Sequence, residues 1–305
     1  MQRRPAAEPG GDRWTSRQAV GVWLEAARPR TLPAAVAPVL VGTAAASQRV
    51  LWRFAAALVV ALAVQVAVNY ANDYFDGVKG VDTAERVGPR RAVAAGLVAP
   101  GRMRAAVAAA GGVAAVAGLA LAAAVGWELL LVGLACFAAL LGYSGGPRPY
   151  ASSGLGEVFV FVFFGLVATV GSTYVQDQAL PAVSVLAAVP VGLLATAILM
   201  VNNLRDTSTD AAAGKRTLAV RLGDAGARAC YLGMLVATFA LVPAIALQRG
   251  SPWPLLALLA GPLALGPLRL VLAGATGRPL IGALAGTARL QLVFASLLGL
   301  GLLLR

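Results

Sequence analysis

Three polar side chains at helical spacing lie where a long apolar run ends. Asn69, Asp73 and Asp76 occupy positions i, i+4 and i+7 after a run that begins at Phe54. If the run is helical, the amide and the two carboxylates share one face at its end. Carboxylates beside a hydrophobic helix are costly unless another charge compensates them. A divalent cation would supply that charge.

A second segment repeats the pattern. Asn203, Asp206 and Asp210 occupy positions i, i+3 and i+7 after the apolar run 189–201, and Lys215 follows. We expect these three side chains to lie on one helical face as well. Because each cluster closes an apolar run, the pair favours a shared cation site over the alternative that acidic residues merely cap membrane helices.

The composition is not that of a soluble protein. Of the 305 residues, 59% are hydrophobic and 12% are charged, with a mean hydropathy of +0.78, whereas about a quarter of the residues are charged in soluble domains. The composition predicts an all-α polytopic membrane protein. The formal net charge of +12 does not indicate a nucleic-acid partner, because the basic residues lie in short loops between apolar runs. The absence of histidine excludes the usual zinc sites and histidine-based triads.

Nine apolar stretches are long enough to be membrane spans. Residues 1–18 are polar and predict a disordered cytosolic tail, whereas 19–305 predict a single transmembrane domain. Pro262 and Pro267 interrupt one of the spans. The predicted spans are 31–48, 54–75, 104–125, 127–145, 156–176, 181–204, 226–248, 253–273 and 281–303.

The distribution of Lys and Arg predicts the orientation. If the nine spans alternate in direction, most of the 25 basic residues fall on the side of the N-terminus, which is therefore predicted to be cytosolic. Trp52, Trp127 and Trp253 then lie at the outer interface, as in an aromatic belt. One acidic segment ends the second span and the other ends the sixth. Both are thus predicted to face the cytoplasm, in a multi-pass protein of the cell membrane surrounded by lipid.

The two acidic segments suit a metal-bound diphosphate. Magnesium takes oxygen ligands and often binds through a few carboxylates together with substrate phosphates, and the bound diphosphate is a good leaving group. Nearby cations would add charge-assisted hydrogen bonds. The candidates for this role are Lys79, Arg90, Arg205 and Lys215, and Arg91 is a further one. The basic segment 86–104 is also explained by the positive-inside bias. An isoprenyl diphosphate fits both the acidic site and the membrane.

The loop after the fourth predicted span carries Tyr143 and Tyr150. An aromatic face stabilises an allylic cation, but tyrosines at a loop edge also anchor a protein at the membrane interface. The sequence favours neither role. Ser144, Ser152 and Ser153 lie in the same loop, but they lack a histidine base, so a serine nucleophile is not expected. No residue is identified as a base that deprotonates an acceptor.

The first acidic segment resembles a motif of the UbiA superfamily of intramembrane aromatic prenyltransferases. Asn72, Asp73 and Asp76 match N-D-x-x-D-x-x-x-D. Gly80 stands where the last aspartate of that motif is expected, and Asp82 follows two residues later.

Further segments are similar to the naphthoate-prenylating branch of that superfamily. Residues 72–82 read N-D-Y-x-D-x-V-K-G-x-D, and residues 202–223 read N-N-x-R-D-x-x-x-D-x-x-x-G-K-x-T-L-A-V-R-L-G. Residues 154–165, G-L-G-E-V-F-V-F-V-F-F-G, also resemble it. The likeness extends from about Arg28 to the last predicted span.

The resemblance implies nine transmembrane helices around a central cavity, with Mg²⁺ as the cofactor. It implies transfer of a polyprenyl chain from polyprenyl diphosphate to a ring carbon of 1,4-dihydroxy-2-naphthoate, with loss of carbon dioxide and diphosphate, in menaquinone biosynthesis. The expected metal ligands are Asp73, Asp76, Asp82, Asp206 and Asp210. The expected catalytic residues are Asp73, Asp76, Asp206, Asp210 and Tyr143. The asparagines expected to orient these carboxylates or to contact substrate are Asn69, Asn72 and Asn203.

Other functions are compatible with parts of the pattern. Within the superfamily, the acceptor could be another aromatic compound such as 4-hydroxybenzoate, or a sugar phosphate. An ion-coupled transporter would need ionisable residues near the membrane midplane, whereas here they collect at one face. A non-catalytic lipid-binding scaffold would not need acids and bases to converge at two helix ends. The prenyl chain length and the oligomeric state are not determined by the sequence.

Overall fold

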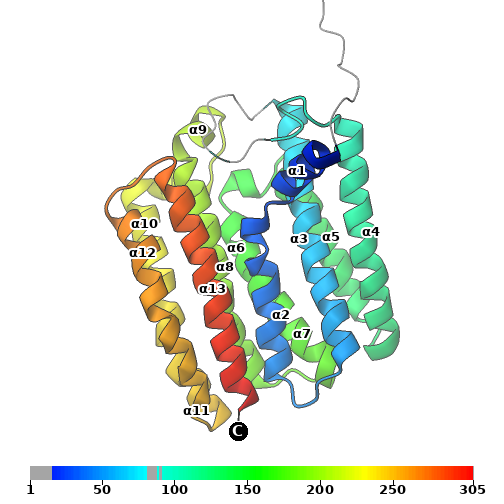
Figure 1. The fold of residues 1–305 in the computed structure, drawn as a ribbon, viewed down its shortest axis with the longest axis vertical. Coiled ribbons are helices and arrows are strands. Elements are labelled where there is room, and N and C mark those ends of the chain that lie inside the picture. Colours follow the sequence, from blue (N-terminus) through cyan, green and yellow to red (C-terminus); the bar gives the residue numbers. More distant parts are fainter. Residues whose placement is uncertain (1–15, 81–87, 89–90, 305) are drawn as a thin grey trace, which may run out of the picture.

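The apolar runs form helices, as expected for a backbone that must satisfy its own hydrogen bonds in lipid (Figure 1). The computed structural model of the chain describes residues 16–80, 88 and 91–304. Residues 1–15 of the predicted tail lie outside the described residues. The helical elements are α1 (Ser16–Ala27), η1 (Pro29–Thr31), α2 (Pro33–Ala45), α3 (Leu51–Lys79), α4 (Pro100–Val125), α5 (Leu129–Ser144), η2 (Ala151–Ser153), α6 (Gly156–Val160), the π-helix η3 (Phe161–Val167), α7 (Ala168–Asp177), α8 (Ala182–Arg205), α9 (Thr207–Ala212), α10 (Leu218–Ala240), α11 (Val242–Arg249), η4 (Trp253–Ala260), α12 (Gly261–Leu272) and α13 (Pro279–Leu303).

Seven helical segments of the described chain are long and apolar enough to cross a membrane. They are Leu51–Lys79, Pro100–Val125, Gly156–Asp177, Ala182–Arg205, Leu218–Arg249, Trp253–Leu272 and Pro279–Leu303. The other two predicted spans, 31–48 and 127–145, correspond to α2 and α5, which are apolar but shorter. The all-helical, multi-pass membrane class is therefore confirmed, and the count of nine crossings stays a prediction.

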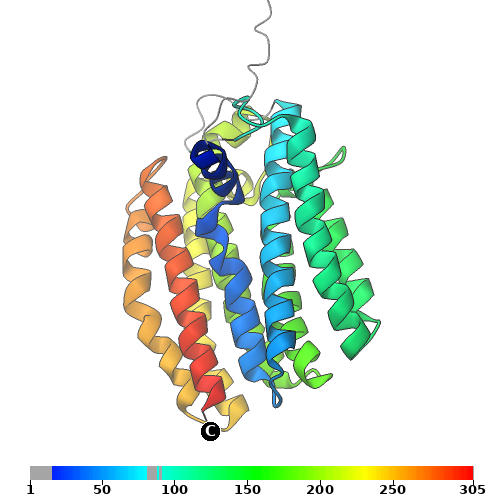
Figure 2. The same ribbon diagram turned by 45° about the vertical axis from the view of Figure 1, so that its right-hand side comes forward.

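The helices surround a central space. On one flank α3 packs against α4 and α5, and on the other α8, α10, α12 and α13 pack together. Between the flanks lie α2 and the segment formed by α6, η3 and α7 (Figures 1 and 2). Because α2 and α7 contact both α3 and α8, they hold the two flanks at a fixed spacing.

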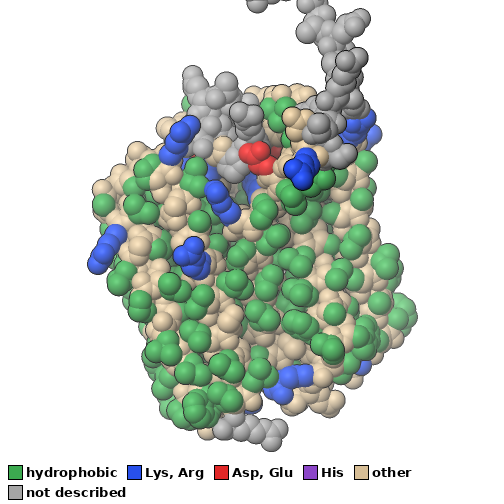
Figure 3. Space-filling view, in the orientation of Figure 1, with side chains coloured by type: hydrophobic (Ala, Val, Ile, Leu, Met, Phe, Trp, Pro, Cys, Tyr) green, Lys and Arg blue, Asp and Glu red, His purple; other side chains and the backbone are tan. Residues whose placement is uncertain are grey.

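The outer wall of the bundle is apolar. Figure 3 shows hydrophobic side chains over much of the face in view, with Lys and Arg more frequent toward the end that carries α1. Exposed Val116, Leu131 and Leu134 extend the apolar surface over α4 and α5. In water such a surface would be unfavourable, whereas lipid accommodates it.

The π-helix η3 and α8 approach each other through two glycines. A methyl group on Gly165 would lie 2.5 Å from the Cα of Gly192, and one on Gly192 would lie 2.9 Å from the Cα of Gly165. Small residues allow membrane helices to approach this closely. The contact sets the position of η3, whose side chains line the central cavity described below.

We expect Gly165→Ala to lower the Tm of the detergent-solubilised protein. The added methyl group must displace the backbone of α8, and overpacking of this kind costs about 1–3 kcal/mol. Gly171→Ala is the matched control in the same span, because nothing lies within 4 Å of its added methyl group. Its Tm should equal or slightly exceed that of the native protein, since alanine favours a helix. Equal Tm values for the two variants would contradict the close packing.

The first acidic segment lies at the end of α3. This helix continues to Lys79 and ends on Gly80, whose backbone is left-handed with a φ of 64°. Asn69, Asp73 and Asp76 therefore lie in its last turns, and all three side chains are buried. The helical spacing expected from the sequence is present.

The second acidic segment is not one continuous helix. α8 ends at Arg205, Asp206 has a φ of −97° and a ψ of 6°, and Asp210 belongs to the short helix α9. The Oγ1 of Thr207 donates to the backbone carbonyl of Asn203 at 2.9 Å, and such side-chain bonds compete with the helical ladder. The expectation of a single helical face for Asn203, Asp206 and Asp210 is therefore wrong.

Candidate active site

A cavity of about 560 Å³ lies among α2, α3, α4, α5, η3 and α8. Its wall is mainly Ala, Val, Leu and Phe. The polar residues that line it near the acidic segments are Arg28, Thr31, Asn69, Asn72, Tyr143 and Asn202. Gln65, Tyr150 and Ser172 also line it. The cavity thus has one polar end and a long apolar body, which suits a molecule with a charged head and a hydrocarbon chain.

The first acidic segment forms hydrogen bonds with residues 91–93, which follow it in the chain. Both oxygens of Asp73 accept backbone N–H bonds, from Ala92 at 2.9 Å and from Val93 at 2.8 Å. Arg91 Nη2 donates to Asp76 Oδ2 at 3.0 Å. Since Asp73 is only 1% exposed, these bonds fix Arg91 against the end of α3.

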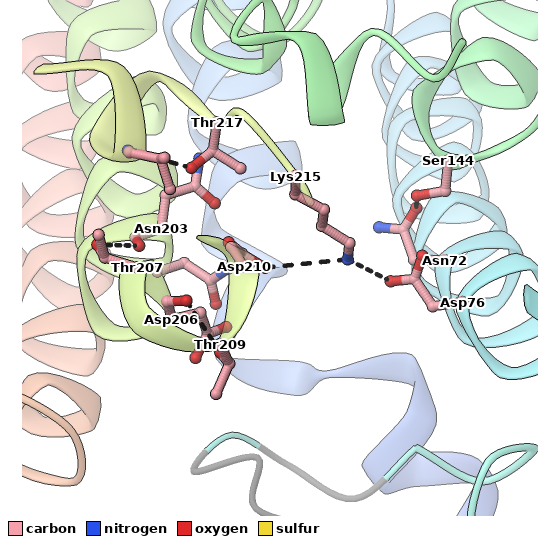
Figure 4. A network of polar contacts seen from close by, with 12 residues as sticks. Asn72, Asp76, Ser144, Asn203, Asp206, Thr207, Thr209, Asp210, Lys215 and Thr217 are labelled. Carbon is pink, nitrogen blue, oxygen red and sulfur yellow. Dashed lines mark hydrogen bonds and ion pairs between the residues drawn. The ribbon is translucent and has the colours of Figure 1, made fainter. Parts of the chain in front are cut away.

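The second acidic segment faces the first across a narrow gap (Figure 4). Arg205 donates from Nε and Nη2 to the two oxygens of Asp206, at 2.7 and 2.6 Å. Lys215 Nζ lies 3.9 Å from Asp210 and 3.5 Å from Asp76. One ammonium group therefore bridges carboxylates from α9 and α3. The structure thus brings the two segments together, although they are far apart in the chain.

The predicted cations differ in their surroundings. Those paired with the acidic segments are Arg91, Arg205 and Lys215. Lys79 is exposed and donates to the backbone carbonyls of Ser144 and Gly146, at 2.8 and 3.1 Å. It therefore ties α3 to the end of α5 and faces no described carboxylate. Asp82 and Arg90 lie outside the described residues.

The three predicted asparagines join different helices. Asn69 Nδ2 donates to the last carbonyl of α1 at 2.8 Å. Asn72 Oδ1 accepts from Ser144 Oγ at 2.7 Å. Asn203 Nδ2 donates to Glu157 Oε1 at 2.8 Å. The first two connect α3 to α1 and α5, and the third connects α8 to α6.

An aromatic row lines the cavity. The ring centroids of Tyr143 and Tyr150 are 5.4 Å apart, Tyr150 stacks on Phe159 at 3.8 Å, and Phe159 stacks on Phe163 at 5.9 Å. The Tyr150 hydroxyl donates to the carbonyl of Ala139 at 2.7 Å, and burial raises the pKa of this phenol above its usual value. Because Tyr150 stays protonated and bonded to the backbone, it presents a ring face and not a base to the cavity.

The donors of the two segments fit Mg²⁺. Within the described ranges, no group of three His, Cys, Asp or Glu could hold a metal by itself, but Mg²⁺ commonly binds through one or two carboxylates and takes its other ligands from water and phosphates. Asp76, Asp206 and Asp210 offer such oxygens. Lys215 lies between Asp76 and Asp210, so its ammonium group shows that a cation is favourable at this position.

Two charged residues beside the cavity and acidic segments have no role assigned from the sequence. Arg28 lines the polar end of the cavity in a left-handed conformation, with a φ of 52°. Its position before a predicted span is equally explained by the positive-inside bias. Glu157 is 3% exposed and contacts Asn203. An acid at the start of an apolar run was the available signal, because such a charge is costly without a function or a partner.

Known proteins are similar to this chain in sequence. Residues 35–280 match the UbiA prenyltransferase family. A Mycobacterium tuberculosis protein named 1,4-dihydroxy-2-naphthoate octaprenyltransferase is 45% identical over 279 residues, covering 90% of this chain and 94% of that protein. An Escherichia coli protein of the same name is 41% identical over 268 residues, covering 82% of this chain and 84% of that protein.

Solved structures share the fold. The apo structure of a UbiA homolog from Aeropyrum pernix K1 has a TM-score of 0.66 at 19% identity and covers 89% of this chain and 95% of its own. A UbiA homolog from Archaeoglobus fulgidus, bound to GPP and Mg²⁺, has a TM-score of 0.58 at 14% identity and covers 91% of this chain and 99% of its own. The likeness to these structures concerns the arrangement of the helices.

Proposed function

The chain belongs to the UbiA prenyltransferase family, and from that membership we propose that it transfers a polyprenyl chain from polyprenyl diphosphate to 1,4-dihydroxy-2-naphthoate. The bond from the allylic carbon to the diphosphate oxygen breaks, a bond to a ring carbon of the acceptor forms, and carbon dioxide leaves. The product is a demethylmenaquinol for menaquinone biosynthesis. The observation that carries this proposal is the apolar cavity whose polar end meets two acidic segments bridged by Lys215.

The cations beside the acidic segments bind the diphosphate. Lys215 and Arg91 reach Asp76 from different parts of the chain, and either can exchange a carboxylate oxygen for a phosphate oxygen without losing a charge-assisted hydrogen bond. Arg205 contacts both oxygens of Asp206, so it also holds that carboxylate in place. Asn72 orients the end of α3 through Ser144.

Asp76, Asp206 and Asp210 would hold Mg²⁺, while Asp73 fixes the segment that carries Arg91. When bound, the metal would neutralise the phosphate oxygens and make diphosphate a better leaving group. Support comes from the oxygen donors present and from the A. fulgidus UbiA homolog that was solved with GPP and Mg²⁺.

The cavity holds the prenyl chain. Its apolar wall excludes water from the allylic carbon, so the developing positive charge meets the ring faces of Tyr143 and Tyr150 instead of a competing nucleophile. The electron-rich naphthoate ring then attacks this carbon. Loss of carbon dioxide restores the aromatic ring and removes the need for a base at the attacked position.

The bundle lies in the cell membrane, in contact with lipid, with its N-terminus and the polar end of the cavity on the cytoplasmic side. The excess of Lys and Arg in the segments on the N-terminal side supports this orientation. In this orientation both charged substrates reach the site from the cytoplasm, and the prenyl chain stays within the depth of the membrane.

The protein in detergent should convert 1,4-dihydroxy-2-naphthoate and a long-chain polyprenyl diphosphate into a prenylated naphthoquinone, measured by chromatography and mass spectrometry after air oxidation. Chelation of the metal should abolish the product, and added Mg²⁺ should restore it. The carboxylates are anions like the diphosphate, so only the metal they bind can neutralise its charge. Product from 4-hydroxybenzoate but not from the naphthoate would overturn the proposed acceptor. No product from either would overturn prenyl transfer.

A further inference from the structure

Glu157 is a buried acid outside the two acidic segments. It opens the span Gly156–Asp177 and is 3% exposed. Its Oε1 accepts a hydrogen bond from Asn203 Nδ2 at 2.8 Å, whereas its Oε2 is buried and has no hydrogen-bond partner in the described part of the chain. A buried carboxylate oxygen without a partner is unfavourable, so its presence calls for a physical reason.

The partner of Glu157 borders the site. Asn203 is 8% exposed and lies one helical turn before Asp206. No described residue donates to its Oδ1, and this oxygen is not among the fully buried atoms that lack a partner, so it keeps some exposed surface. Figure 4 shows Asn203 on the same side of the gap as Asp206 and Asp210, opposite Asp76.

We propose that Glu157 is a positioning residue that turns the side-chain carbonyl oxygen of Asn203 toward the metal–diphosphate site. In the structure Asn203 Nδ2 donates to Glu157 Oε1, so the amide presents its NH₂ group to Glu157 and its oxygen away from it. Oxygen is the atom that suits Mg²⁺ or a water bound to it. This inference rests on the proposed function and adds a residue that acts through Asn203.

A carboxylate at position 157 fixes the orientation of the Asn203 amide, whereas a neutral amide would not. A glutamine there could bond either end of the Asn203 amide, because it both donates and accepts. The orientation of the amide would then be undetermined, and half of the orientations would point NH₂ at a cation.

The surroundings of Glu157 keep it in place. α6 packs against α8, and Phe159, two residues further on, stacks on Tyr150 at 3.8 Å. Oε2 of Glu157 is buried, and Glu157 is not among the residues that line the cavity. Its effect on the site therefore passes through Asn203.

Reversing the polarity of this hydrogen bond tests the proposal. The probe is a non-hydrolysable polyprenyl diphosphate analogue, and its binding to the full chain in detergent is measured by calorimetry as Mg²⁺ is varied. Glu157→Gln should raise the Mg²⁺ concentration for half-maximal binding by about 10- to 100-fold, the usual effect of losing an outer-shell partner. The double variant E157Q/N203D should recover most of the native value. There the amide at position 157 donates to a carboxylate at position 203, whose second oxygen faces the gap, and the net charge is native.

Glu128→Gln is the matched control, because it makes the same charge change at an exposed position, where Tyr174 donates to the carboxylate. Its Mg²⁺ dependence should be native. Native binding by Glu157→Gln, or a double variant no better than Glu157→Gln, would overturn the proposal. Loss of one limb of the pH–rate profile in Glu157→Gln, with native Mg²⁺ dependence, would also overturn it and indicate proton transfer instead. If the native protein shows no Mg²⁺-dependent binding, it is the proposed function that fails.

Discussion

Asp210→Asn should lower kcat/KM for prenyl transfer by about 100- to 1,000-fold, the range found when one group that stabilises transition-state charge is removed. Asp210 is a half-buried carboxylate of α9, and Lys215 Nζ lies 3.9 Å from it. The substitution preserves the shape of the side chain but removes a negative charge from the metal–diphosphate site. Loss of this 3.9 Å ion pair should by itself lower the Tm only slightly. Steady-state kinetics at saturating Mg²⁺ and a thermal melt measure both effects.

Two further variants separate the site from general effects of charge. Asp177→Asn makes the same change at the opposite end of the bundle, where Asp177 accepts from the backbone N–H groups of Ser47 and Gln48, and activity should be native. Asp206→Asn should lose activity and also stability. It leaves the Arg205 side chain, which is 3% exposed, without its counter-charge, and breaking a buried pair costs about 3–5 kcal/mol. Native activity in Asp210→Asn would remove the carboxylates from the mechanism.

Lys215→Gln should change the dependence of the rate on polyprenyl diphosphate and its dependence on Mg²⁺ in opposite directions. The KM for polyprenyl diphosphate should rise by about 10- to 100-fold, because a hydrogen bond to a charged group contributes about 1.5–3 kcal/mol. The Mg²⁺ concentration for half-maximal activity, measured at saturating diphosphate, should fall. The ammonium group now lies 3.5 Å from Asp76 and 3.9 Å from Asp210, and its removal leaves those carboxylates more attractive to a divalent cation.

Arg216→Gln is the control for Lys215→Gln. It removes the same charge from the next residue, whose side chain is exposed, so both dependences should stay native. Equal shifts in the two variants would mean that Lys215 acts only through the net positive charge of this loop. A higher Mg²⁺ requirement in Lys215→Gln would contradict competition between the ammonium group and the metal.

The positions of the helices could be predicted because the constraint on them is local. A backbone in lipid must bond within its own segment, so each apolar run had to become a helix, and α3 carries Asn69, Asp73 and Asp76 on its last turns as their spacing indicates. The break at Asp206 was not predictable from spacing. At this break the hydroxyl of Thr207 bonds the backbone carbonyl of Asn203, and a side-chain bond of this kind competes with the helical ladder.

The sequence by itself determined the membrane class, the helical runs and the two acidic helix ends, because hydropathy and the 3.6-residue period act within one segment. Only the tertiary structure decided which side chains meet. Lys79 and Lys215 each follow an acidic segment by a few residues, yet only Lys215 reaches Asp76. Lys79 is bound by the carbonyls of Ser144 and Gly146, because α5 ends beside α3. Such contacts depend on how distant helices pack, and no local pattern encodes that packing.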